Sequence, residues 1–158
     1  MRRTLIFLML LQCLSAAGAE VRVGTAHRML VPTMQHLRDT CGASGDYDAC
    51  TRFVAWQLNA TCASDSDGWR MRASATFTPW IVLYNIEQLS HELDHVGDVR
   101  RSAEQYVDEL EHERFASPEE CRQRTIQEAG SFEETIRRFA SESNAVRHPL
   151  VYAHASGR

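Results

Sequence analysis

The sequence predicts an α+β domain in which a small antiparallel sheet of about three strands packs on a long antiparallel pair of helices. Between residues 51 and 78 the chain has the alternation and the β-branched and aromatic residues of strands. From about residue 79 onward, apolar residues instead recur every three or four positions, as on the buried face of a helix. The length of 158 residues favours a single domain.

The start of the chain predicts a signal peptide. Two arginines precede an apolar run over 5–11, and residues 17–19 (AGA) have the A-x-A form of a cleavage site. We therefore expect residues 1–19 to be removed, leaving a single domain over 20–158 in the periplasm or outside the cell. The apolar run is short for a permanent anchor, so we expect no membrane contact after cleavage.

The charge of the mature chain gives no indication of a nucleic-acid partner. Removal of Arg2 and Arg3 leaves 15 of the 17 basic residues against 21 acidic ones, a net charge of −6. The sequence shows no basic patch and no second hydrophobic segment. The composition therefore favours partners other than nucleic acids and membranes.

Four cysteines remain after the signal peptide, an even number typical of two disulfides in an oxidising compartment. Three pairings are possible, and we favour two particular bridges. Cys41–Cys50 would close a short loop rich in glycine and aspartate. Cys62–Cys121 would tie the sheet to the second long helix.

The first half of the chain predicts three strands and a short helix. Segment 20–26 (EVRVGTA) alternates well enough for a first strand, and 31–40 (VPTMQHLRDT) is typical of a short helix with a proline in its first turn. Segment 51–58 (TRFVAWQL) favours a second strand, and 69–78 (WRMRASATFT) alternates clearly. We expect the second and third strands to pair as a hairpin.

The second half predicts two long helices. Thr78 suits the N-cap of the first helix and Pro79 its first position, and an apolar stripe then continues to Leu110. After a break, Ser117 and Glu120 form the S-x-x-E capping box that begins a second helix. A short connection between long helices predicts an antiparallel pair.

The first of these helices contains the motif H-E-x-x-H, at His91, Glu92 and His95. Histidines four residues apart lie on one face of a helix, so both imidazoles can bind one metal ion. Glu92 lies about 100° around the helix from His91, beside the ion and not bonded to it. There it can act as a general base toward water and deliver the proton to a leaving amine. The motif predicts a Zn²⁺ site with a catalytic glutamate.

A second interpretation treats the same residues as the polar face of an amphipathic helix. His91, His95 and Asp98 lie nearly opposite the apolar stripe, where polar residues are expected in any case. The protein would then be a non-catalytic, disulfide-stapled binding or scaffold protein of the periplasm, with or without a structural metal.

A catalytic zinc site needs a third protein ligand and leaves one position for water. Asp98 is on the histidine face but lies two turns from His91. Glu142 is on the second helix, which is expected to return past the motif. His148 follows that helix and offers an imidazole, so we favour His148 as the third ligand.

The chain resembles a bacterial family of unknown function described as predicted secreted zinc-dependent proteases. The resemblance covers most of the mature chain and rests on the order in which its features occur. These features are Cys62 before an alternating strand, Pro79-Trp80 after that strand, the motif His91, Glu92 and His95, and then Cys121 and His148. It implies a zincin-like domain, a zinc site and counterpart roles for Cys62 and Cys121. The final histidine of the family stands in Y-D-x-x-T-x-H-G, of which "ESNAVRHP" retains the histidine.

Together these features predict an exported, zinc-dependent, metallopeptidase-like hydrolase that acts on a peptide or protein substrate. Peptides of the cell wall are an alternative substrate. An extended peptide would bind by strand addition along 69–78.

Overall fold

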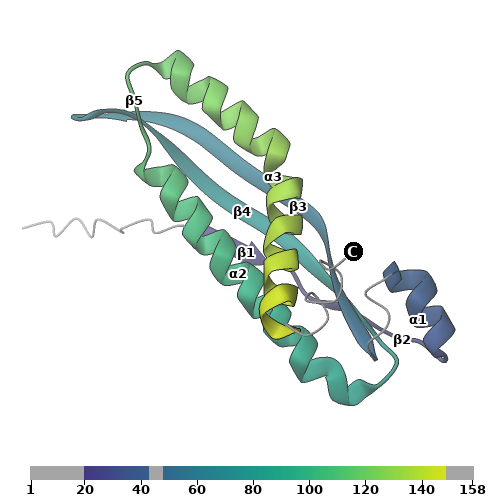
Figure 1. Ribbon diagram of the computed structural model, residues 1–158. Helices are drawn as coiled ribbons and strands as arrows, with labels where there is room; N and C mark the ends of the chain where they lie inside the picture. Colours follow the sequence, from purple (N-terminus) through teal and green to yellow (C-terminus); the bar gives the residue numbers. More distant parts are fainter. Residues whose placement is uncertain (1–19, 43–47, 149–158) are drawn as a thin grey trace, which may run out of the picture.

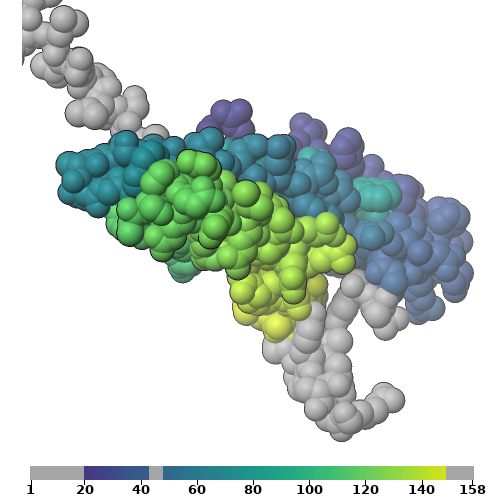
Figure 2. All heavy atoms as spheres, turned by 90° about the horizontal axis from the view of Figure 1, so that it is seen from above, coloured from purple at the N-terminus to yellow at the C-terminus, as the bar shows by residue number. Residues whose placement is uncertain are grey.

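The computed structural model describes residues 20–42 and 48–148, so the predicted signal peptide lies outside the described residues. One five-stranded sheet carries two long helices on one face, and a short helix lies near one end (Figure 1). In the view from above, the strands form one layer, and α3 (Pro118–Arg147), coloured green to yellow, lies below them in the picture (Figure 2). No helix among the described residues is long and apolar enough to cross a membrane.

Two long strands form the centre of the sheet. β3 (Ala49–Asp65) and β4 (Gly68–Leu83) pair antiparallel along almost their whole length. β3 occupies one edge of β4. Along the other edge of β4 lie three short strands in succession: β5 (Arg114–Phe115), β1 (Glu20–Val23) and β2 (His27–Leu30). β5 pairs antiparallel with β4, whereas β1 and β2 pair parallel with it.

The predicted fold class, a three-stranded antiparallel sheet on an antiparallel helix pair in a zincin-like arrangement, is therefore wrong. The sheet has five strands and includes two parallel pairs. A parallel pair requires a long connection between its strands. Here that connection includes a helix and the whole of β3, so no local pattern in the sequence reveals it.

The segment 20–26, predicted as one strand, is interrupted at Gly24. The Gly24 N–H donates to the Phe77 carbonyl at 2.8 Å, and a Cβ at Gly24 would lie 2.6 Å from the Thr78 hydroxyl oxygen. This close approach favours glycine, and the chain then continues as β2 further along β4.

The prediction of a helix beginning at Thr78 and Pro79 is also wrong. β4 continues to Leu83, and α2 (Leu89–His112) follows a 3₁₀ helix, η2 (Ile86–Gln88). The apolar residues that end β4 are buried on both faces of the sheet, and such a run suits a buried strand as well as a helix.

Pro79 fits in this strand because of its position. A proline has no N–H to donate to a neighbouring strand. On one side of β4, Pro79 lies where the neighbour changes from β1 to β2. On the other side it lies near the irregularity in β3 between Val54 and Gln57. Both neighbours are therefore interrupted close to the proline.

The two long helices, α2 and α3 (Pro118–Arg147), run in opposite directions over one face of the sheet (Figure 1). The main core lies between these helices and the sheet, and its largest fully buried side chains include Phe77, Phe132 and Met71. The short helix α1 (Met34–Cys41) packs on the opposite face of the sheet, because it contacts Val82 while the alternate residue Ile81 faces α2.

Two disulfides join different elements of the fold. Cys41–Cys50 joins the end of α1 to the start of β3, and Cys62–Cys121 joins β3 to the first turn of α3. These are the pairings favoured from the sequence.

The expected site of strand addition is not available on β4, because both of its edges are paired. Among the described residues β3 pairs only with β4, so the free edge of the hairpin belongs to β3.

Candidate metal centre

Three histidines meet at one end of the helix pair. His91 and His95 lie one turn apart at the start of α2, and His148 is the C-cap of α3. Because the helices run in opposite directions, the start of α2 and the end of α3 lie at the same end of the pair (Figure 1). Residues 57 positions apart therefore come into contact.

The three Nε2 atoms face one another. The separations are 3.1 Å between His91 and His148, 3.2 Å between His91 and His95, and 3.3 Å between His95 and His148. Three nitrogens bound to zinc at about 2.05 Å in tetrahedral geometry lie about 3.3 Å from one another. The three histidines therefore lie close enough to hold one metal ion, and they form the only such cluster within the described ranges.

Hydrogen bonding among the rings does not account for this triangle. The Nε2 atom of a neutral imidazole is either a donor or an acceptor. Among three mutually adjacent nitrogens at least two have the same role, so at least one contact joins two donors or two lone pairs. A cation that accepts all three lone pairs removes this conflict.

The surroundings favour the neutral form of two of the rings. Burial lowers the pKa of His95 to about 4, and the positive charges of His91 and His148 act in the same direction. Burial and His91 also lower the pKa of His148. A metal ion needs the lone pair of a neutral imidazole, so both rings are in the form that binds it.

Glu92 lies between α2 and the sheet, with 5% of its surface exposed. Thr51 on β3 donates from Oγ1 to Oε2 of Glu92 at 2.7 Å. Burial raises the pKa of Glu92, while the Thr51 hydrogen bond and His91 act against the rise. The Glu92 carboxylate is not one of the clustered ligand atoms, as expected for a residue beside the ion and not bonded to it.

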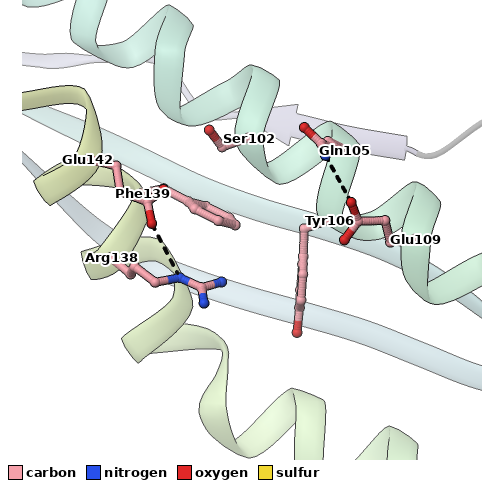
Figure 3. Close-up of a pocket in the computed structure, with 7 residues that line it drawn as sticks. All are labelled: Ser102, Gln105, Tyr106, Glu109, Arg138, Phe139 and Glu142. Carbon is pink, nitrogen blue, oxygen red and sulfur yellow. Dashed lines mark hydrogen bonds and ion pairs between the residues drawn. The ribbon is translucent and has the colours of Figure 1, made fainter. Parts of the chain in front are cut away.

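The two alternative ligands lie outside the cluster. Asp98 faces α3, where Arg147 donates from Nη2 to its Oδ1 at 3.0 Å. Glu142 lines a groove on the outer side of the helix pair, where its Oε1 lies 3.8 Å from Nε of Arg138 (Figure 3). Of the three candidates considered for the third ligand, only His148 reaches His91 and His95.

The sequence did not reveal the polar residues behind the histidines. His95 Nδ1 lies 2.9 Å from Ser143 Oγ, which donates to Oδ2 of Asp98 at 2.9 Å. Arg147, the residue before His148, binds both Asp98 and Asp94. The one signal in the sequence was that Asp98 lies on the histidine face. The positions of Ser143 and Arg147 depend on how α3 is rotated about its axis.

No protein-family model, curated protein or solved structure matches this chain. The resemblance to the family of predicted secreted zinc-dependent proteases therefore stays a prediction. The geometry and chemistry of the site are therefore the basis for the function of this protein.

Proposed function

We propose that this protein is an exported, zinc-dependent, metallopeptidase-like hydrolase in which His91, His95 and His148 bind Zn²⁺ and Glu92 is the general base. The observation that carries the proposal is the triangle of Nε2 atoms, together with a buried glutamate, Glu92, in the same turn of α2 as His91 and His95. Imidazole ligands suit zinc. Three protein ligands leave one position open, as in catalytic zinc sites, whereas structural sites have four protein ligands.

A zinc ion held by His91, His95 and His148 would lower the pKa of a bound water and polarise a substrate carbonyl. In this site the three histidines would hold the ion, and Thr51 orients the Glu92 carboxylate through its hydrogen bond. Glu92 takes a proton from the attacking water as the new C–O bond forms. It then gives the proton to the leaving amine as the C–N bond of the peptide breaks.

The proposed location is the periplasm or the outside of the cell. The two disulfides support an oxidising compartment, because disulfides are rare where thiols are kept reduced. A peptide or protein is the proposed substrate.

Metal analysis of the mature chain, purified without chelators, tests the proposal together with two substitutions. Wild type should contain one zinc ion per chain and hydrolyse unfolded protein. Glu92→Gln should keep zinc and fold but lose about 10²- to 10⁴-fold in rate, because an amide does not accept the proton. His91→Ala should lose the metal, because too few ligands remain.

Two outcomes would contradict the proposal. A wild-type protein that contains no zinc and takes up none on addition would exclude the zinc site. A protein that binds zinc but hydrolyses neither unfolded protein nor peptidoglycan fragments would favour the alternative, a non-catalytic, disulfide-stapled protein with a structural metal.

A further inference from the structure

One carboxylate behind the metal centre is connected to two of the three histidines. Asp98 on α2 accepts a hydrogen bond from Ser143, which contacts His95. Asp98 also accepts hydrogen bonds from Arg147, which immediately precedes His148 in the chain. Arg101 completes the set by pairing with Asp98 from within α2.

We propose that Asp98 is a positioning residue for the metal centre, which fixes the protonated nitrogen of His95 through Ser143 and the location of His148 through Arg147. This inference rests on the proposed function, because it describes how the proposed ligands are held.

The hydrogen bonds that connect Asp98 to His95 through Ser143 have only one possible donor-to-acceptor direction. Hydrogen bonds from Arg147 hold the pKa of Asp98 below its usual range, so the carboxylate only accepts hydrogen bonds. The Ser143 proton is therefore directed at Asp98, and a lone pair of Ser143 Oγ faces His95 Nδ1. Nδ1 must then carry the ring proton, which leaves the lone pair of His95 on Nε2, the atom that faces the other histidines.

The connection to His148 acts through the backbone, because Arg147 is the preceding residue in the chain. Arg147 reaches two carboxylates one turn apart on α2, with Nη2 3.0 Å from Oδ1 of Asp98 and Nη1 3.2 Å from Oδ2 of Asp94. Helix ends fray readily unless they are held. The double contact holds the last turn of α3 against α2, so that His148 projects toward His91 and His95.

The same contacts explain why Asp98 is not itself a ligand. Ser143 and Arg147 together occupy both of its carboxylate oxygens. Arg147 and Asp98 are both partly shielded from solvent, with 26% and 21% of their side chains exposed. A shielded pair that belongs to a network is stronger than an isolated pair on the surface.

The first test is the tautomer of His95 in metal-free protein, measured from long-range ¹H–¹⁵N NMR correlations of the ring. Wild type should carry the proton on Nδ1. Ser143→Ala removes the acceptor, so His95 should show a mixture of both tautomers. A wild-type ring that carries its proton on Nε2 would overturn the proposal, and this readout needs no metal.

The second test is zinc affinity, measured by competition with a chromophoric chelator. Ser143→Ala and Arg147→Gln should each weaken binding by about 10- to 100-fold, as is typical when a group behind a ligand is removed. Asp98→Asn should weaken it at least as much as either, because both connections depend on this carboxylate. Glu142→Gln is the matched control, since Glu142 precedes Ser143 on α3 and makes only an exposed ion pair with Arg138 among the described contacts.

The outcomes separate this inference from the proposed function. If Ser143→Ala and Asp98→Asn bind zinc as tightly as wild type while His91→Ala does not, the positioning role fails and the metal site stands. If wild type binds no zinc, the proposed function fails, and the NMR measurement still decides whether Ser143 fixes the His95 tautomer.

Discussion

Thr51 is the residue through which the sheet holds the proposed general base. It lies on β3, and its hydroxyl donates to the Glu92 carboxylate across the boundary between sheet and helix. A hydrogen bond to a charged group is worth about 1.5–3 kcal/mol. It also lowers the pKa of Glu92, in opposition to the effect of burial.

Replacement of Thr51 by valine keeps the shape of the side chain and removes the donor. We expect Thr51→Val to retain zinc and to hydrolyse peptide about tenfold more slowly, because the carboxylate loses its orienting contact. The acidic limb of kcat/KM against pH should move to higher pH, since the pKa of Glu92 rises without the hydrogen bond and the base must be ionised to act. Thr51→Ser is the control that keeps the hydroxyl. An unchanged rate and pH profile in Thr51→Val would contradict this role.

The spacing of the motif was enough to predict how His91, Glu92 and His95 lie, because the geometry of a helix fixes residues three and four apart. The spacing of the motif does not predict which residues of α3 reach the site. His148 was favoured from its residue type and from the resemblance, whereas Ser143 went unnoticed. Both positions depend on the packing of one helix on another, which local periodicity does not determine.

Among the elements, the start of α3 was predicted well and the start of α2 was not. Ser117 Oγ accepts from the Glu120 N–H at 3.2 Å, so a local motif determines where α3 begins. No comparable local signal marks Leu89, because the apolar residues 81–83 suit a buried strand as well as a helix. The sequence does not predict β2, because its four residues show no clear alternation. Its partner in the sheet, β4, is also distant in the sequence.

The two disulfides should differ in their effect on stability. Cys62–Cys121 spans 59 residues of chain and Cys41–Cys50 spans 9, and a longer closed loop restricts the unfolded chain more. Replacing both cysteines of the long bridge by serine should lower the free energy of unfolding by about 4 kcal/mol, against about 3 kcal/mol for the short bridge. Urea unfolding of metal-free protein measures both values. A larger loss from the short bridge would indicate that residual structure in the unfolded state, and not chain entropy, determines the effect.

A partly buried polar cluster joins α2 to α3. The Tyr106 hydroxyl donates to Glu128, which also pairs with Arg124, and Arg124 in turn pairs with Glu113 at 2.9 Å. Burial raises the pKa of Tyr106 above its ordinary value, and the hydrogen bond and negative charge of Glu128 raise it further. The folded protein therefore keeps this phenol protonated at a pH where the unfolded chain releases the proton.

This difference predicts a loss of stability in alkaline solution. The unfolded phenol ionises near pH 10, so the unfolded state gains stability relative to the folded state as pH rises above about 10. Tyr106→Phe should lose about 1.5–3 kcal/mol at pH 7, from the missing hydrogen bond to the Glu128 carboxylate, and should show a flatter decline above pH 10. Urea unfolding of both proteins at pH 8 to 11 measures the slopes. Equal slopes would mean that Tyr106 does not keep its proton in the folded state.

In the molecule as a whole, the candidate metal centre lies where the two long helices meet at one end, away from the bridge that holds the other end of α3. Cys62–Cys121 fixes the first turn of α3 to the sheet. The three histidines lie at the opposite end of that helix, at the start of α2. The disulfide therefore holds one end of α3, and the proposed zinc ion would hold the other.

Zinc should accordingly stabilise the folded protein as a whole. A ligand that binds only the folded state contributes about 2.7 kcal/mol at a concentration of 100 times its Kd. For a domain of this size that corresponds to a rise in Tm on the order of 10 °C. Calorimetry with zinc and with chelator measures the difference, which His91→Ala should abolish. A Tm that is the same with zinc and with chelator in wild type would argue against a metal centre between the helices.

Hydrogen exchange should locate this stabilisation at the end of α3. In metal-free protein the last turn is held by Arg147 and by the His148 N–H, which donates to the Asn144 carbonyl at 2.8 Å. Amides there should exchange through local fraying within short labelling times, whereas those of the β3–β4 hairpin should not. Zinc should slow exchange over residues 144–148 in wild type, because His148 then binds the same ion as two residues of α2. In His148→Ala the last turn should exchange equally fast with and without zinc. If zinc binds wild type but leaves exchange in this turn unchanged, His148 is not the third ligand.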